Sequence, residues 1–324
     1  MGGSWPAAKK NLVFVIAAAA AFIIVQALRT ANVLTNYHEI TIALICINII
    51  LAVSLNLITG FTGQFSLGHA GFMSIGAYSC ALILIEYPTV WGFLGGLLTG
   101  GLAAAAAGFL IGLPTLRLKG DYLAIATLGM AEIIRVVFLN LEITGGASGL
   151  ASIPRIANWW WLFIFAVLSI VLINNFIKSS LGRACISIRE DEIAAESMGI
   201  NSTKYKVMAF AFGAFFAGIA GGLYASYFFF LKPNIFGFMK SIDVLVLVVL
   251  GGLGSLSGSV IAAVLLTILT TWLQQFTEVR MIVYALMLII IMIFRPQGLM
   301  GSVEITDLAS KAAKRFGGGK ERVE

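Results

Sequence analysis

The chain has 324 residues, of which 60% are hydrophobic and only 11% are charged, and its formal net charge is +6. Soluble domains average about 45–50% apolar and about 25% charged residues, so this composition excludes a soluble globular protein and predicts an all-α polytopic membrane protein. No charge-rich stretch is long enough for a separate soluble domain. The positive charge indicates membrane topology, so we expect membrane lipid as a partner and no nucleic acid.

Apolar runs of about 20 residues, the length that spans a bilayer as a helix, follow one another along the chain. The first run, residues 11–28, follows Lys9 and Lys10 and is longer than the apolar core of a signal peptide, so we interpret it as a retained helix. Further spans are expected at residues 40–58, 72–85, 91–113, 122–139, 160–177, 207–230 and 281–294. Together with broken or re-entrant helices, about eight to ten membrane segments result.

Residues 55–78 interrupt the apolar background with glycines, and Gln64, Ser66 and His69 stand among them, with Asn56 at the start. Glycine lets the backbone bend and lets membrane helices approach closely. Polar side chains at membrane depth indicate backbone that lines a path. A tight connector between two packed helices is the alternative interpretation.

The span at residues 122–139 carries two charges, Glu132 and Arg135. They are three residues apart, so they share one face of a helix and can form an ion pair. Charges within the membrane usually pair with one another. The pair is therefore either a structural lock or part of a lined cavity.

Lysine and arginine favour the cytoplasmic loops of membrane proteins. An alternating assignment of the loops places most of these residues on the side that holds both termini and residues 178–206. We therefore expect a cytoplasmic N-terminus (1–10), a transmembrane domain (11–295) with a cytoplasmic loop (178–206), and a cytoplasmic tail (296–324). Residues 241–275 must then make no net crossing, as two short helices or as a re-entrant pair.

A glycine break at 251–258 divides that last region, and Gly251, Gly254 and Ser257 follow the spacing of Gly60, Gly63 and Ser66. Broken hydrophobic segments in corresponding positions mark the binding site of many transporters. The shared spacing indicates either an internal repeat with a path between the two breaks or a chance match within glycine-rich membrane sequence. The candidate path residues are Asn56, Gln64, Ser66, His69, Glu132, Arg135, Gly251, Gly254 and Ser257.

Good helix formers occupy Arg189–Glu196 within the loop 178–206, and Gly199 suits the C-cap of a helix over Arg189–Gly199. We expect one short surface helix with Ile193, Ala194 and Met198 as an apolar strip and its acidic residues in water. It is either a solvated connector or a helix that docks in a groove of a partner.

Sites for catalysis are missing from the sequence: there is no GxxxxGK[ST] phosphate loop, no HExxH motif and no pair of neighbouring cysteines. The two histidines, His38 and His69, have no nucleophile setting around them. We therefore expect no enzyme activity, no catalytic residue and no metal site.

Several segments in a fixed order carry a resemblance to a known family. They are GFTGQFSLGHAGFMSIGAY, LPTLRLKGDYLAIATLGMAEIIR, TGGASGL, GRACISIREDEIAAESMGINSTKYKVMAFAFGAFFAGIAGGLYA and VLGGLGSLSG. In this order they resemble the M-type permease subunit of branched-chain amino acid ABC transporters, over about residues 40–299.

The resemblance implies a heterodimer with a second homologous permease subunit, two ATP-binding-cassette ATPase subunits, and a periplasmic or extracellular substrate-binding protein that delivers leucine, isoleucine or valine. ATP would be bound by the ATPases, so this chain would need no cofactor. The complex would lie in the cytoplasmic membrane of a bacterium or archaeon. The family's ATPase-coupling helix maps to Arg189, Glu190, Asp191, Glu192, Ala195, Glu196, Met198 and Gly199.

Three alternatives remain open at this point. Closely similar permeases carry urea or short-chain amides. An autonomous ion-coupled secondary transporter would use Glu132, Arg135 and His69 as coupling residues and would work without an ATPase. A membrane enzyme or scaffold would show no substrate flux.

Overall fold

Helices make up most of the part of the protein that this computed structural model describes, residues 34–118 and 120–275 together with 19–20, 22–31, 285–286, 289, 293–294 and 298–301. The helices are α2 (Asn36–Asn56), α3 (His69–Glu86), α4 (Val90–Thr115), α5 (Asp121–Asn140), α6 (Trp159–Lys178), α7 (Ser180–Glu190), α8 (Glu192–Ser197), α9 (Ser202–Phe228), α10 (Phe238–Gly251) and α11 (Leu256–Trp272). A π-helix, Leu57–Phe61, extends α2, and short 3₁₀ segments lie at Glu142–Thr144, Gly146–Ser148, Pro233–Phe236 and Leu273–Gln275.

Within these residues, seven helical segments are long and apolar enough to cross a membrane, and α11 is a shorter apolar helix. This confirms the predicted polytopic all-α class. The segment 1–10, much of the expected first span (11–28) and of the last span (281–294), and most of the tail (296–324) lie outside the described residues.

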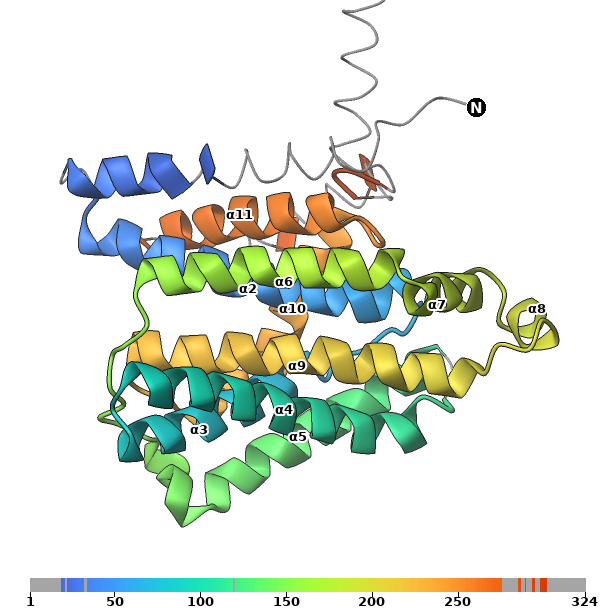
Figure 1. Cartoon of the computed structure of the whole chain (residues 1–324), viewed down its shortest axis with the longest axis horizontal. Helices are drawn as coiled ribbons and strands as arrows, with labels where there is room; N and C mark the ends of the chain where they lie inside the picture. Colours follow the sequence, from blue (N-terminus) through green and yellow to red (C-terminus); the bar gives the residue numbers. More distant parts are fainter. Residues whose placement is uncertain are drawn as a thin grey trace, which may run out of the picture.

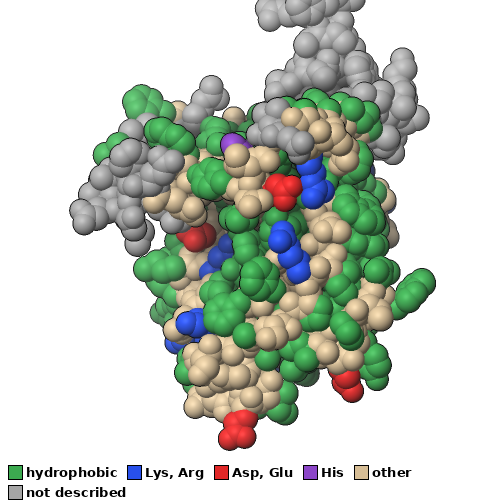
Figure 2. Space-filling model, turned by 90° about the vertical axis from the view of Figure 1, so that its left-hand side faces the viewer, with side chains coloured by type: hydrophobic (Ala, Val, Ile, Leu, Met, Phe, Trp, Pro, Cys, Tyr) green, Lys and Arg blue, Asp and Glu red, His purple; other side chains and the backbone are tan. Residues whose placement is uncertain are grey.

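The long helices run side by side, and α7 and α8 project beyond them at one end, which we call the α7–α8 end (Figure 1). Seen from the opposite end, hydrophobic side chains are spread over the flanks of the bundle, with acidic and basic side chains interspersed (Figure 2). Such flanks suit contact with lipid.

Glycine allows the backbones of α3, α4 and α9 to touch. A Cβ atom at Gly76 would lie 2.1 Å from the carbonyl oxygen of Gly218, and one at Gly100 would lie 2.7 Å from that of Gly76. Small residues support this kind of packing in membranes, where dispersion and close approach hold helices together. These three helices form the most tightly packed part of the bundle.

Two helices begin inside the bundle rather than at its ends. The non-helical residues 62–68 lead from the π-helix to α3, whose first residue, His69, lies beside Ser54 of α2. The 3₁₀ segment Pro233–Phe236 leads to α10. The backbone N–H of Ala70 contacts the hydroxyl of Ser241 at 3.4 Å, so the N-terminal turns of α3 and α10 meet.

Residues 241–275 form two helices that pack against each other, which is one of the two predicted arrangements. The turn between α10 and α11 lies beside Asn56 at the end of α2. The other end of α11 lies beside the start of α2, because the Tyr37 hydroxyl donates to the carbonyl of Thr271 at 2.6 Å. Residues 241–275 therefore run along α10 to the α7–α8 end of the bundle and return along α11, so they make no net crossing.

The single helix predicted at Arg189–Gly199 is wrong in its bounds. Asp191 is extended, with φ −155°, and its carboxylate accepts from the backbone N–H of Ala194 at 3.0 Å. Aspartate is a strong N-cap residue, so α8 starts anew after it, while Arg189 and Glu190 belong to α7. Gly199 has φ +84° and terminates α8 in the left-handed conformation that glycine adopts easily.

Candidate functional site

Asn56 joins the end of α2 to the turn between α10 and α11. Its amide nitrogen donates to the carbonyl of Ser255 at 2.8 Å and to the hydroxyl of Ser259 at 2.7 Å. Its amide oxygen accepts from the backbone N–H of Gly254 at 2.9 Å. The side chain is fully buried and all three contacts reach the second glycine break. The two breaks predicted from the sequence therefore touch each other.

Glycine is required at several positions of this junction. A Cβ atom at Gly60 would lie 1.8 Å from the amide oxygen of Asn56 and 2.4 Å from the nitrogen of Gly254. One at Gly251 would lie 2.6 Å from the carbonyl carbon of Gly258, so the end of α10 touches the start of α11. Ser257 is half-buried beside Ser255, with 3.4 Å between the two hydroxyl oxygens.

Arg189, at the end of α7, reaches the same junction. Its Nη1 donates to the carbonyl of Gly60 at 2.8 Å. If Gly254 carried a Cβ atom, that atom would lie 2.9 Å from the same Nη1. Its Cγ would lie 3.0 Å from a Cβ atom at Gly63, which has φ +71°. Its guanidinium also pairs with Glu190. One side chain of the predicted coupling segment thus contacts both breaks.

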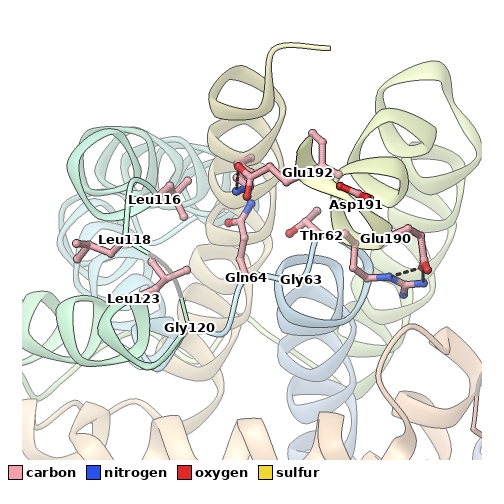
Figure 3. A pocket seen from close by; sticks show the side chains of 13 residues that line it. Thr62, Gly63, Gln64, Leu116, Leu118, Gly120, Leu123, Glu190, Asp191 and Glu192 are labelled. Atoms are coloured by element: carbon pink, nitrogen blue, oxygen red, sulfur yellow. Dashed lines mark hydrogen bonds and ion pairs between the residues drawn. The ribbon is translucent and has the colours of Figure 1, made fainter. Parts of the chain in front are cut away.

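A hollow of about 260 Å³ lies next to Arg189 (Figure 3). It is lined by Thr62, Gly63, Gln64, Leu116, Leu118, Gly120, Leu123, Ile188, Arg189, Glu190, Asp191, Glu192 and Lys206. Gln64 points into it, between the leucines and the acidic residues, and neither amide atom has a hydrogen-bond partner among the described residues. Glu192 and Lys206 form an ion pair of 2.6 Å at its edge.

Two predicted path residues, Ser66 and His69, are buried and do not line this hollow. The Ser66 hydroxyl accepts from the backbone N–H of Gly68 at 3.3 Å. The His69 Nε2 lies 2.8 Å from the hydroxyl of Ser54, and both residues are buried. The Nδ1 of His69 has no partner in the described part of the chain.

Glu132 and Arg135 form the predicted ion pair, with 2.6 Å between Oε2 and Nε. Arg135 also donates from Nη1 to the amide oxygen of Asn234 at 3.0 Å, which joins α5 to the 3₁₀ segment before α10. The side chains are 36% and 24% exposed, so the pair lies at the surface of the subunit. The structure does not bring it together with the Asn56 junction.

A further polar group lies at half depth and was not predicted as a site. The Nζ of Lys240 donates to the amide oxygen of Asn48 at 3.3 Å, and the Asn48 amide nitrogen donates to Thr267 at 2.9 Å. The signal in the sequence was Lys240 with Asp243 at the edge of an apolar run. A lysine at that edge is equally typical of a loop, to which we assigned it.

The predicted apolar strip of α8 faces outward. Ile193 is 75% and Met198 83% exposed, and Ala194 is exposed as well, whereas Ala195 is buried. Glu196 accepts a hydrogen bond from the Ser202 hydroxyl at the start of α9. The strip is therefore available to a partner while the helix itself is held to α9.

Among the described residues, no three His, Cys, Asp or Glu side chains gather as a metal site would require.

The family whose sequence model matches residues 37–292 is described as "Branched-chain amino acid transport system / permease component". The high-affinity branched-chain amino acid transport system permease protein LivM of Salmonella typhimurium is 41% identical over 289 residues, 78% of this chain and 68% of the relative. LivM of Escherichia coli (strain K12) is 40% identical over the same shares. The permease protein LivH of that strain is 26% identical over 293 residues, 79% of this chain and 92% of the relative. No solved structure matches the chain.

Proposed function

The chain belongs to the family of branched-chain amino acid transport permease components, and from this membership we propose that it is one permease subunit of an ATP-driven importer of leucine, isoleucine and valine. The observation that carries the proposal is the match over residues 37–292 together with 41% identity to a LivM protein. The multiple apolar helices of a multi-pass membrane protein support it.

We propose a second, homologous permease subunit as the direct partner. LivM and LivH of Escherichia coli are both named as permeases of the high-affinity branched-chain amino acid transport system, and this chain is similar to both, with 40% and 26% identity. The higher identity to LivM supports a LivM-like position for this chain, with a LivH-like chain as the other permease. The two would enclose one path, to which Asn56, Gln64, Ser66, His69, Glu132, Arg135, Gly251, Gly254 and Ser257 would contribute.

Two ATPase subunits would bind at the α7–α8 end and hold the ATP, so that this chain has no cofactor and no enzyme activity of its own. The exposed Ile193 and Met198 support this docking site, because apolar side chains on a projecting helix suit a groove in a partner. The α7–α8 end and both termini would be cytoplasmic, in the cytoplasmic membrane of a bacterium or archaeon. A binding protein would deliver the amino acid at the opposite end.

The central experiment is uptake of labelled leucine by proteoliposomes that contain both permeases and the ATPases, with the binding protein outside and ATP inside. Uptake should require ATP and both partners, and excess urea should not compete with leucine. Competition by urea or a short amide would move the substrate to that class. Ion-driven leucine uptake by this chain alone would overturn the proposal in favour of a secondary transporter, and no flux at all would favour an enzyme or scaffold.

The docking site has a separate test. Ile193→Asp should weaken ATPase binding by about 30-fold or more, because loss of an apolar anchor costs at least about 2 kcal/mol at an interface. Ile143→Asp is the matched control, since Ile143 is equally exposed but lies between α5 and α6 at the other end. Co-purification of the ATPases measures the difference, and equal recovery with both variants would refute the docking assignment.

A further inference from the structure

The surface where α5 meets the start of α10 carries charges of both signs. Glu132 and Arg135 lie on α5, and a Cβ atom at Gly237, the N-cap of α10, would lie 3.7 Å from the Arg135 Cδ and 4.0 Å from the Glu132 Oε1. Lys240 follows in the first turn of α10, where its backbone N–H donates to the carbonyl of Gly237 at 3.0 Å. Asp243 lies one turn further and is exposed.

These charges lie within the membrane span. Lys240 is bonded to Asn48, which is halfway along the 26-residue span Asn36–Phe61. Glu132 lies in the interior of the 20-residue span Asp121–Asn140. Exposing an ionised side chain to lipid at such depth costs too much free energy, so these side chains face a water-filled cavity or another protein. This face of the subunit is therefore not its lipid face.

Apolar side chains share the same turn of α10. Met239 is 63% exposed and lies four residues from Asp243, on the same face of the helix, and Phe238 is exposed next to it. One turn of α10 thus carries a half-buried basic group that is bonded to Asn48, an exposed acidic group and an exposed apolar side chain. A branched-chain amino acid presents the complementary set: a carboxylate, an ammonium group and an aliphatic side chain.

The backbone at the start of α10 adds to this match. Gly237 has no side chain that could accept hydrogen bonds from the first N–H groups of α10. The helix begins inside the bundle, after the 3₁₀ segment. The N-terminus of a broken helix carries partial positive charge and suits the carboxylate of a substrate. An interface with another protein would have to accommodate this whole set of charges, of which Glu132 and Arg135 already form an ion pair.

We propose that Lys240, Asp243 and Met239, beside the Glu132–Arg135 pair, form the substrate-contacting wall of this subunit. The ligand is the zwitterion of a branched-chain amino acid, with its carboxylate toward Lys240 and the start of α10, its ammonium group toward Asp243, and its side chain on Met239. This assignment rests on the proposed function, and it adds residues from α10 that no sequence motif marked.

The test uses the full importer with its binding protein and measures leucine uptake together with ATP hydrolysis. Lys240→Met and Asp243→Asn should each lower the uptake per ATP hydrolysed at least tenfold, while Lys240→Arg keeps most of it. Lys232→Met is the matched control, because Lys232 is exposed before the 3₁₀ segment and should leave the ratio unchanged. Met239→Ala should change the ratio of valine to leucine uptake about threefold, whereas Leu110→Ala, an exposed apolar residue of α4, should not.

Two results would overturn the inference. One is an unchanged uptake per ATP in Lys240→Met and Asp243→Asn. The other is loss of the second permease from the purified variants, which would make this face a subunit contact. Failure of the proposed function is distinguishable, because the wild-type complex would then show no ATP-driven leucine uptake at all.

Discussion

At the scale of single residues, the most constrained polar side chain is that of Asn56. It supplies two donors and one acceptor to the turn between α10 and α11, at 2.7–2.9 Å, in a fully buried position. Only an amide can do all of this, since a carboxylate has no donor and a hydroxyl has one. The residue therefore fixes how the two breaks meet.

Asn56→Asp is expected to destabilise the subunit. The new carboxylate would face the carbonyl of Ser255 without a donor, and burying an unsatisfied polar group costs about 1–3 kcal/mol, more when it is charged. Asn158→Asp is the control, because Asn158 is an exposed N-cap of α6 where aspartate is equally suitable. Thermal unfolding of the purified protein in detergent measures both, and equal stability would refute the structural role of the amide.

At the scale of elements, one side chain of α7 reaches both glycine breaks. Arg189 links the end of α7 to the carbonyl of Gly60 and lies against Gly254. A displacement of α7 must therefore move the π-helix at the end of α2 and the turn between α10 and α11, or break this hydrogen bond. The π-helix is a sensible place for such a link, because π-bulges often occur at functional sites.

Arg189→Gln should separate transport from ATP hydrolysis. Loss of a charge-assisted hydrogen bond removes about 1.5–3 kcal/mol of interaction, enough for a tenfold or larger fall in leucine uptake per ATP hydrolysed. The ATPases should still co-purify, because the apolar strip of α8 is intact. Arg183→Gln is the control on the same helix, because the Arg183 guanidinium donates to the carbonyl of Lys178, outside both glycine breaks. Normal uptake in Arg189→Gln would show that α7 moves the breaks by another contact.

Gly60→Ala tests the junction itself. The added methyl group would overlap the amide oxygen of Asn56 and the backbone of Gly254, and overpacking of this kind costs about 1–3 kcal/mol. Gly95→Ala is the control, since a Cβ atom there meets no atom within 4 Å. The apparent melting temperature should fall for Gly60→Ala only, and an unchanged value would mean that the junction adjusts without strain.

The sequence was informative where composition and spacing act locally. Apolar length predicted the helices, the spacing of Glu132 and Arg135 predicted their ion pair, and the glycines predicted both breaks. It did not predict that α7 ends and α8 begins at Asp191, because helix propensity alone favours one continuous helix there. It did not predict the contact of Lys240 with Asn48 or of Arg189 with Gly60, because these depend on how distant segments pack.

At the scale of the whole molecule, sidedness is the property on which the proposed partners depend. The positive-inside count predicts that the α7–α8 end is cytoplasmic and that the loops after α5 face outward. The three cysteines are all buried and free, which makes the chain suitable for labelling of introduced cysteines. Burial also raises the pKa of the Cys185 thiol to about 11, so it stays protonated and unreactive near neutral pH.

One cysteine introduced at each of two exposed positions, in separate variants, should therefore report the orientation. Met198, the site of Met198→Cys, follows α8, and Ala147, the site of Ala147→Cys, is in the 3₁₀ segment Gly146–Ser148 at the opposite end of the bundle. A membrane-impermeant maleimide at pH 7 should modify Ala147→Cys in intact cells, but Met198→Cys only after the membrane is opened. The unmodified parent protein is the control, and its labelling should rise only at alkaline pH, where the Cys185 thiolate forms. The reverse pattern would place the α7–α8 end outside, where no ATPase could reach Ile193, and would refute the proposed arrangement of the importer.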